Sequence, residues 1–473
     1  MTNLDLCYTP ATELVHMYRA KDVSPVEVIQ NSLDRIDDVN GKLNCFCFTY
    51  PEEALEKAKA AEKRLISGNA RPLEGIPVAI KDFTPTKGKV TTRGSKLLQN
   101  WVPDWNPVLV ERLESAGAIM VGKTTTPEFA TSSFTDSPLW GITRNPWNTS
   151  RTPGGSSGGS GAAVASGCVP FAEGTDMGGS VRIPAALCGI VGHKPSLGRI
   201  PMDIIDTAYC NISHFGPLAR TVGDATLFLD TVQGEHPSDI QSLPRCELTI
   251  PTPTDVKGMK FALDVTLGFC AVDPDVEANL RATANALAEA GAIIEEVDLG
   301  WDSRIIDLWI GTWGVFMAAA YENTTDVPLD DNRGRMSEGL VSLIEMGRKI
   351  DAVTARKWEF ERTRYWRKLA DVLESHQALL CPTMAITAPS VELRASDFDT
   401  INEQGMLECL DMTSPFNYMA QCPTLSVPSG FAGGLPTATQ IVARRWDDAL
   451  ALRIGASIEK AMPWSHKRPD IKD

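Results

Sequence analysis

Apolar residues recur every three to four positions among charged ones in the first part of the chain. Residues 24–39 and 51–66 show this pattern, which predicts two amphipathic helices. Beyond residue 73, short apolar runs alternate with helical stretches. Residues 75–82 (GIPVAIKD) predict a strand, and residues 107–123 (PVLVERLESAGAIMVGK) predict a helix that ends near a glycine and continues as a strand. Such alternation is typical of α/β proteins.

Residues 150–200 are rich in Gly, Ser and other small residues. They include a helix-compatible run, SGAAVASG, and an apolar run at 185–191. We therefore interpret this region as tightly packed loops and helices and not as a flexible linker.

The middle of the chain has a more helical texture. MKFALDV and AIIEEVDL predict strands on either side of a helix at 274–290, and charged helices continue through 356–375. After these helices, ALLCPT, TLSVPSG and ATQIVA predict strands again. The simplest architecture is one α/β sheet covered by helices, with a helical lobe inserted before the last strands.

The expected organisation is a single domain, because no internal repeat or linker divides the chain. Its parts are N-terminal helices at 1–70, a core at 73–240, a more helical lobe at 243–380 and a return to the core sheet at 381–473.

Composition limits the classes of function. Hydrophobic residues make up 43% of the 473 positions, enough for a large core, yet no apolar run is long enough to cross a membrane. The formal net charge of −15 disfavours nucleic acids and anionic membranes as partners. The first residues show no secretory signal, so we expect a cytoplasmic protein.

Eleven cysteines are scattered along the chain, without a CxxC pair or a Cys/His cluster. We interpret them as buried thiols and expect neither a zinc site nor a disulfide framework.

Three residues form a candidate proton path when they are considered together. Lys81 ends the apolar run GIPVAIK, Ser156 lies in RTPGGSSGGSG, and Ser180 lies in GTDMGGSVRIP. A serine hydroxyl is a weak nucleophile until a base removes its proton, and a lysine whose pKa is lowered by burial can be that base. A second serine between them can pass the proton on. We therefore predict Ser180 as the nucleophile, Ser156 as the relay and Lys81 as the base.

Glycines precede both serines. Gly178 and Gly179 allow the chain before Ser180 to turn its amides inward, which is what stabilisation of an oxyanion requires. Gly154 and Gly155 allow an unusual backbone shape before Ser156.

These segments resemble successive parts of the amidase signature. The resemblance includes GIPVAIKD, PGGSSGGSGAAVASG and GTDMGGSVRIPAALCGIVGHKP, and it extends to TRNPWN and SPFNYMAQCPTLSVPSG, so it covers most of the chain. It implies an amide hydrolase with a central mixed sheet of about eleven strands covered by helices on both faces. It also implies a Ser-Ser-Lys triad, a cis peptide bond between Gly155 and Ser156, and no metal or organic cofactor.

The resemblance further implies roles for residues around the triad. The oxyanion hole would be formed by the amides of Met177, Gly178, Gly179 and Ser180. Substrate-binding and supporting positions would be Ala130, Thr175, Asp176 and Arg182. One departure is His193, where the family commonly has leucine. The partner is expected to be a small-molecule amide, carbamate or ester, and the resemblance leaves a homodimer open.

Three alternatives stay open. KTTTPEF at 123–129 and the middle segment favour a free-standing amidase over the A subunit of a glutamyl-tRNA amidotransferase, whose usual motifs differ there. A non-catalytic relative that only binds an acyl ligand is the second. A GxSxG nucleophile elbow around Ser156 or Ser157 is the third, although no strand directly precedes it. The tryptophans from Trp301 to Trp313 are interpreted as core packing and left out of the site.

Overall fold

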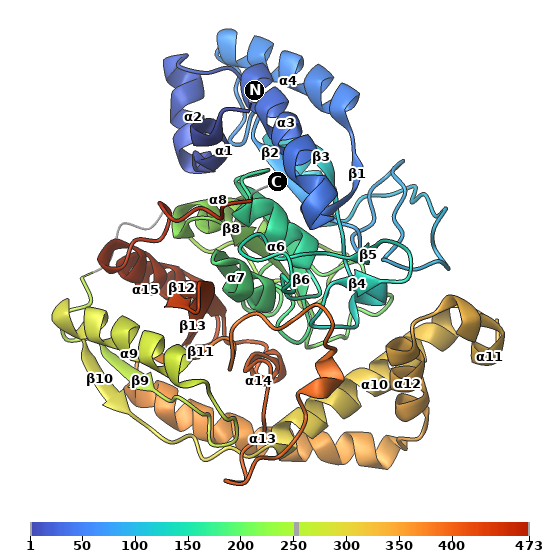
Figure 1. Cartoon of the computed structure of the whole chain (residues 1–473), viewed down its shortest axis with the longest axis vertical. Coiled ribbons are helices and arrows are strands. Elements are labelled where there is room, and N and C mark those ends of the chain that lie inside the picture. The colour runs from blue at the N-terminus through green and yellow to red at the C-terminus, as the bar shows by residue number, and fades with distance from the viewer. Residues whose placement is uncertain (1, 250–254, 472–473) are drawn as a thin grey trace.

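The protein is described by a computed structural model that covers residues 2–249 and 255–471. Its centre is an eleven-stranded mixed sheet (Figure 1). From one edge to the other the strands are β1 (Phe46–Thr49), β3 (Ile119–Thr124), β2 (Pro77–Lys81), β6 (Phe171–Asp176), β8 (His214–Ala219), β7 (Val191–Lys194), β12 (Thr424–Ala432), β13 (Leu435–Ala443), β11 (Ala378–Pro382), β9 (Lys260–Leu263) and β10 (Ile293–Glu296).

Both parallel and antiparallel pairs occur in this sheet. β2 is parallel to its neighbours β3 and β6, whereas β6, β8, β7, β12, β13 and β11 are joined in antiparallel pairs. At the far edge β11, β9 and β10 are parallel again. A separate two-stranded sheet consists of β4 (Asp136–Ser137) and β5 (Gly141–Ile142). The predicted mixed sheet is confirmed. The interpretation of residues 150–200 as loops and helices is wrong for β6 and β7, which lie in the middle of the sheet and are too short and too rich in small residues to show a strand pattern.

Helices cover both faces because successive residues of a strand point to opposite sides. Val78 and Ile80 of β2 belong to a core with α8 (Val222–Val232) and α15 (Asp448–Ala461). Ala79, between them, belongs to a second core with α3 (Pro25–Leu43) and α6 (Gly158–Ala165). An internal strand such as β2 is therefore buried along its whole length.

The remaining helices follow the predicted pattern closely. The predicted helix 51–66 is α4, and the helix predicted at 274–290 is α9. The bounds are α1 (Leu4–Tyr8), α2 (Ala11–Ala20), α4 (Pro51–Ile66), α5 (Val108–Ala116), α7 (Arg182–Cys188), α9 (Pro274–Glu289), α10 (Arg304–Thr324), α11 (Leu329–Asn332), α12 (Glu338–Arg348), α13 (Ala352–Ser375) and α14 (Ser414–Tyr418).

Local chemistry explains where several helices begin and end. Ser24 and Glu27 form a capping box at the start of α3, and Pro25 occupies its first turn. Gly117 ends α5 in the left-handed conformation with φ of 97°, as its position in the sequence predicts. The chain then continues directly into β3.

The middle segment contributes to the sheet as well as to a helical layer. β9, β10 and β11 extend the sheet edge, while α10, α12 and α13 lie together at the end of the molecule opposite α1–α4 (Figure 1). α10 packs against α12, α13 and α14, which brings it next to the return of the chain towards β12.

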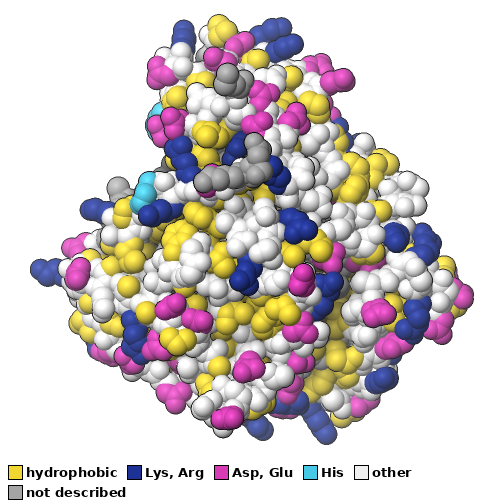
Figure 2. All heavy atoms as spheres, viewed as in Figure 1, with side chains coloured by type: hydrophobic (Ala, Val, Ile, Leu, Met, Phe, Trp, Pro, Cys, Tyr) yellow, Lys and Arg dark blue, Asp and Glu magenta, His cyan; other side chains and the backbone are white. Residues whose placement is uncertain are grey.

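The surface mixes charges of both signs in spite of the net negative charge. Figure 2 shows Lys and Arg side chains interspersed with Asp and Glu over the visible face, with apolar side chains between them. Among the described residues no helix has the length and apolarity of a membrane span. The described residues also contain no group of three His, Cys, Asp or Glu side chains arranged to hold a metal ion.

Two cysteines depart from the sequence interpretation. Cys270 and Cys409 form a disulfide, although 139 positions separate them in the chain. The expectation that all cysteines are thiols is therefore wrong for this pair, because folding brings the segment around Cys409 against the end of β9. The other nine cysteines are free, and most of them are buried as predicted.

Candidate active site

Lys81 lies at the carboxyl end of β2, between two other buried strands. Its side chain is 0% exposed. The ammonium nitrogen Nζ lies 2.7 Å from Ser156 Oγ and 2.9 Å from Thr175 Oγ1. The structure thus brings together a lysine and a serine that are 75 positions apart, as the sequence predicts, and adds the Thr175 hydroxyl as a second partner.

Burial makes this lysine easy to deprotonate. Desolvation lowers the pKa of Lys81 to about 7, while the negative charges of Glu173 and Asp176 act in the opposite direction. A lysine with this pKa has a substantial population of the neutral amine near neutral pH, which is the form that accepts a proton.

Glu173 is a charged neighbour that the sequence analysis missed. It is 0% exposed and accepts hydrogen bonds from the Lys81 backbone N–H at 2.9 Å and from Thr84 Oγ1 at 3.0 Å. Desolvation raises the pKa of Glu173 to about 7. Nothing in FAEGTD marks this glutamate as special, since only the pairing of β6 with β2 places it beside Lys81.

Ser156 is held by a backbone that glycine makes possible. The Gly155–Ser156 peptide bond is cis, as the family resemblance implies. Gly154 has φ of 84°, and a Cβ on Gly155 would lie 2.5 Å from the carbonyl oxygen of Ser132. Immediately after this turn, the Ser157 N–H donates to the Ser180 carbonyl at 3.2 Å, which ties the two serine loops together.

Asp176 organises the turn that carries Ser180. Its carboxylate accepts the N–H of Gly179 at 2.8 Å and that of Val181 at 3.2 Å, and it forms a buried ion pair with Arg182 at 3.0 Å. Arg182 and its hydrogen bonds hold the pKa of Asp176 well below its usual range, against the opposing effect of burial. The N–H of Gly179, one of the four amides predicted for the oxyanion hole, thus donates to Asp176 in this structure.

Residues near the C-terminus complete this turn, and the sequence analysis had assigned them no role. Asn417 donates to Asp176 Oδ1 at 2.8 Å and accepts from Arg182 at 2.6 Å. The Thr413 hydroxyl donates to the Gly178 carbonyl at 2.6 Å. Asn417 lies in the segment SPFNYMAQCPTLSVPSG, and Thr413 directly precedes it. Both are more than 230 positions from Asp176, so the sequence alone does not indicate that they contact its turn.

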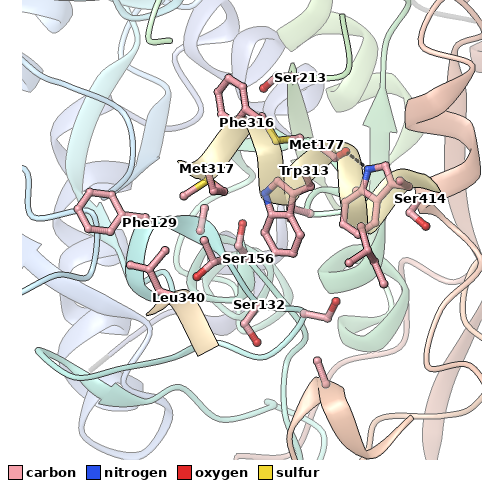
Figure 3. Close-up of a pocket in the computed structure, with 18 of the residues that line it drawn as sticks. Phe129, Ser132, Ser156, Met177, Ser213, Trp313, Phe316, Met317, Leu340 and Ser414 are labelled. Carbon is pink, nitrogen blue, oxygen red and sulfur yellow. Dashed lines mark hydrogen bonds between the residues drawn. The ribbon is translucent and has the colours of Figure 1, made fainter. Parts of the chain in front are cut away.

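A cavity of about 1060 Å³ opens directly above these groups, and Ser156 and Ser180 both line it. Ala130 lines it too, with φ of 60° in the left-handed region, next to Phe129. Figure 3 shows Ser156 in the middle of the cavity, with Phe129 and Leu340 on one side and Trp313 and Met177 on the other.

Apolar side chains from α10 dominate one wall of this cavity. Trp309 and Trp313 stack with ring centroids 5.1 Å apart, and the Trp309 indole N–H donates to the Met177 carbonyl at 3.1 Å. The interpretation of the tryptophans as core packing is therefore wrong for Trp313 and incomplete for Trp309, which packs against the core and also lines the cavity. It is confirmed for Trp301, which is 2% exposed and packs in the core. α10 is apolar on two faces, so periodicity alone did not separate the core face from the cavity face.

His193, the departure from the family pattern, lies in β7 and not on the cavity wall. It is 0% exposed, and its Nε2 lies 3.4 Å from Asp448 Oδ1. Desolvation lowers the pKa of His193. Its neighbour Lys194 is also buried and donates to the carbonyls of Ala420 and Cys422. These contacts give the pair a packing role.

Known proteins resemble this chain over nearly its whole length. A family model described as Amidase matches residues 27–452. An acylamidase of Rhodococcus erythropolis is 35% identical over 476 residues, which cover 99% of this chain and 98% of that protein. The A subunit of the glutamyl-tRNA(Gln) amidotransferase of Chloroflexus aggregans is 34% identical over 480 residues, covering 96% of each. The crystal structure of a bacterial aryl acylamidase has a TM-score of 0.89 and 30% identity, with 97% of each chain covered.

The fold is of the α/β class, and it places a buried lysine beside a Gly-flanked serine. The chain belongs to the amidase signature family. It is an amidase, a hydrolase of amide C–N bonds.

Proposed function

We propose that the reaction proceeds through an acyl-enzyme on Ser180, with Ser156 as proton relay and Lys81 as base. The observation that carries this proposal is the contact of 2.7 Å between a fully buried Lys81 Nζ and Ser156 Oγ on a cavity that Ser180 also lines. A neutral amine in this place accepts the Ser156 proton while Ser156 accepts the proton of Ser180.

The first half-reaction in this proposal begins at Ser180. Ser180 Oγ attacks the carbonyl carbon, and its proton moves by way of Ser156 to Lys81. The negative oxygen is stabilised by backbone amides of the 177–180 turn, which Asp176 and Thr413 fix in place. Lys81 returns the proton through Ser156 to the leaving amine as the C–N bond breaks. Water releases the acid by the same path, and no cofactor enters any step.

Thr175 has a supporting role in this path. The Lys81 ammonium donates to both Ser156 and Thr175, and the neutral amine keeps one donated hydrogen bond while it accepts from Ser156. The lysine therefore changes its protonation state without moving. Ala130, Asp176 and Arg182 are proposed to shape the substrate site through the contacts described above.

The cavity supports a preference for aryl or alkyl acyl groups. Its walls include Phe129, Trp309, Trp313, Phe316 and Met317, which offer apolar contact to a ring or chain. The aryl acylamidase with TM-score 0.89 fits this preference by its name. We propose a small-molecule acyl amide as substrate and a free-standing enzyme, and we retain the expectation of a cytoplasmic protein, with a homodimer left open.

Trapping of the acyl-enzyme tests the proposal. A fluorophosphonate probe should label the purified chain at Ser180, and tryptic mass spectrometry should place the adduct on the peptide that contains GTDMGGSVR. Labelling should vanish in Ser180→Ala and persist in Ser157→Ala, whose serine lies in the other loop. Absence of label on Ser180 in a folded protein would overturn the mechanism and revive a ligand-binding role.

An amidotransferase component remains a second candidate, because the A subunit of such an enzyme is 34% identical over 96% of the chain. The two functions differ in their need for a partner. The purified chain alone should hydrolyse simple anilides at a rate that depends on Ser180. Activity that appears only with glutamine and an added partner protein would favour the second candidate.

A further inference from the structure

Among the described residues that line the cavity, Arg93 is the single basic side chain. The described residues that line the cavity also include four aspartates, of which Asp206, Asp307 and Asp399 are exposed at its rim. Asp411 is hydrogen-bonded by Thr413. In the described part of the chain none of these carboxylates, nor any other, forms an ion pair with Arg93.

The Arg93 guanidinium has little of the hydrogen bonding that a buried cation requires. Its Nε is buried without a partner among the described residues, and Nη2 makes one long contact of 3.5 Å to the Ile204 carbonyl. Desolvation lowers the pKa of Arg93, while the negative charges of Asp206 and Asp82 act in the opposite direction. Neither carboxylate forms an ion pair with the half-buried guanidinium among the described residues, so a ligand group that completes its hydrogen bonds binds there with a gain.

Two aromatic rings hold the guanidinium in position. Its Cζ lies 4.9 Å from the ring centroid of Phe83 and 5.3 Å from that of Trp101. These rings supply the apolar contacts of the guanidinium, so its in-plane N–H donors are what remains for a ligand. Two such donors in one plane match the two oxygens of a carboxylate.

The backbone of Arg93 is held in an unusual conformation. Its φ is 51°, in the left-handed region that a non-glycine residue seldom adopts. The Arg93 N–H donates to the Asp82 carbonyl at 2.9 Å, and its carbonyl accepts from Phe129 N–H at 2.8 Å. Phe129 also has a positive φ. Backbone strain of this kind concentrates at functional sites, and here it orients two residues of the cavity wall.

Arg93 also lies close to the proposed base. The same Phe83 ring that contacts the guanidinium lies with its centroid 5.7 Å from Lys81 Nζ. A group bound by Arg93 therefore lies in the cavity that Ser156 and Ser180 also line.

We propose that Arg93 is a specificity-determining residue that binds a carboxylate on the substrate, in the same cavity as the scissile amide. The inference rests on the proposed function of the same cavity and narrows the substrate class to acyl amides that carry an acidic group. The apolar wall formed by α10 contacts the rest of such a substrate.

Matched pairs of substrates test this inference. On the acyl side, the 4-nitroanilide of glutaric acid is compared with that of 5-oxohexanoic acid, in which a methyl ketone replaces the carboxylate. On the amine side, N-butyryl-4-aminobenzoate is compared with N-butyryl-4-aminoacetophenone. The native enzyme should have the higher kcat/KM for the carboxylate in at least one pair.

Arg93→Gln should reduce that carboxylate-to-ketone ratio by roughly 10- to 100-fold, because it removes a charged pair of donors. Arg93→Lys should give an intermediate ratio, since it keeps the charge and loses the planar fork. Arg19→Gln, a change of an exposed arginine on α2, should leave the ratio unchanged. A ratio at or below one in both pairs for the native enzyme overturns the inference, whether or not the Arg93 variants fold.

Binding without turnover separates this inference from the mechanism. Calorimetric titration of Ser180→Ala with the two acyl-side compounds should show the same preference for the carboxylate, and the Ser180→Ala, Arg93→Gln double variant should lose it. If the native enzyme hydrolyses neutral anilides through Ser180 but shows no carboxylate preference in rate or binding, Arg93 is not a specificity residue and the mechanism stands. If binding is selective but Ser180→Ala is as active as the native enzyme, the mechanism fails and the role of Arg93 stands.

Discussion

The floor and the wall of the cavity are built in opposite ways. The floor consists of Lys81, Ser156 and the 173–182 segment, where polar side chains are buried in strands and glycine turns and each is tied to several partners. The wall contributed by α10 consists of half-buried aromatic and aliphatic side chains on one helix. Chemistry thus depends on a rigid, desolvated network, and substrate choice depends on a surface whose side chains can change with little effect on that network.

The two regions meet at one point. The Trp309 indole donates to the Met177 carbonyl, and Thr413 donates to the next carbonyl, that of Gly178. A change in the floor should therefore abolish the reaction for all substrates, whereas a change in the wall should reorder substrates. The following predictions test this division.

The largest effect is expected from the nucleophile. Ser180→Ala should lower kcat for every anilide by roughly 10⁴- to 10⁶-fold, because the residues of such a path act as one unit. The double variant with Ser156→Ala should be no worse than the single variant. Steady-state rates on acetyl and benzoyl anilides provide the measurement. Additive losses, or a loss confined to one substrate, would contradict a common proton path.

The role of Lys81 as the base predicts a specific pH dependence of kcat/KM. Lys81 must be neutral to accept a proton, and burial lowers its pKa to about 7, so kcat/KM should rise with pH up to about 7 and level off above it. Lys81→Met should reduce kcat/KM by roughly 10³-fold or more and remove this limb. A matched control is Lys123→Met, which removes another buried lysine that donates to the Thr84 carbonyl and to Thr91. A native profile that falls between pH 6 and 8 would argue against a neutral lysine.

A methyl group at the junction should disturb both regions. A Cβ on Gly178 would lie 2.2 Å from the ring of Trp309, so Gly178→Ala must displace that ring or the turn. We expect a loss of stability of about 1–3 kcal/mol and lower rates on all substrates. Gly339→Ala on α12 is the control, because a Cβ at that position would have nothing within 4 Å and alanine favours a helix. The measurements are the thermal unfolding and the hydrolysis rates of both variants. Equal stability and equal rates in the two variants would show that the contact between Trp309 and the turn can adjust to an added methyl group.

The smallest effect is expected in the wall. Trp313→Ala should lower kcat/KM for a benzoyl anilide by roughly 10- to 100-fold, because a ring loses its apolar contact, and should change acetyl anilide hydrolysis much less. Val315→Ala, a change on the same helix at a residue that packs against the core, serves as the control for the loss of helix packing. Equal losses of kcat/KM for the benzoyl and the acetyl anilide would show that Trp313 supports the reaction itself and not the choice of substrate.

The sequence was a good guide to the parts of the floor that depend on local chemistry. Periodicity placed β2 and its final Lys81, and the glycines marked both serine turns, because turns and strand ends are encoded by neighbouring residues. The sequence analysis did not predict the roles of Glu173, Thr413 and Asn417. Their partners lie far away along the chain, and no local pattern marks these residues. The place of Trp309 and Trp313 on the cavity wall was not predicted because a helix with two apolar faces gives one signal for core and cavity alike.

The sequence by itself determined many of the helices and strands, the glycine-dependent turns and the identity of the three side chains proposed to react. It did not reveal β1, β6, β7 and β8. Only the tertiary structure decided that Lys81 loses its water, that Glu173 lies beside it and that Arg93 faces the cavity without an ion-pair partner among the described residues. The physical reason is that backbone conformation follows from nearby residues, whereas desolvation and charge pairing depend on which distant segments fold against one another.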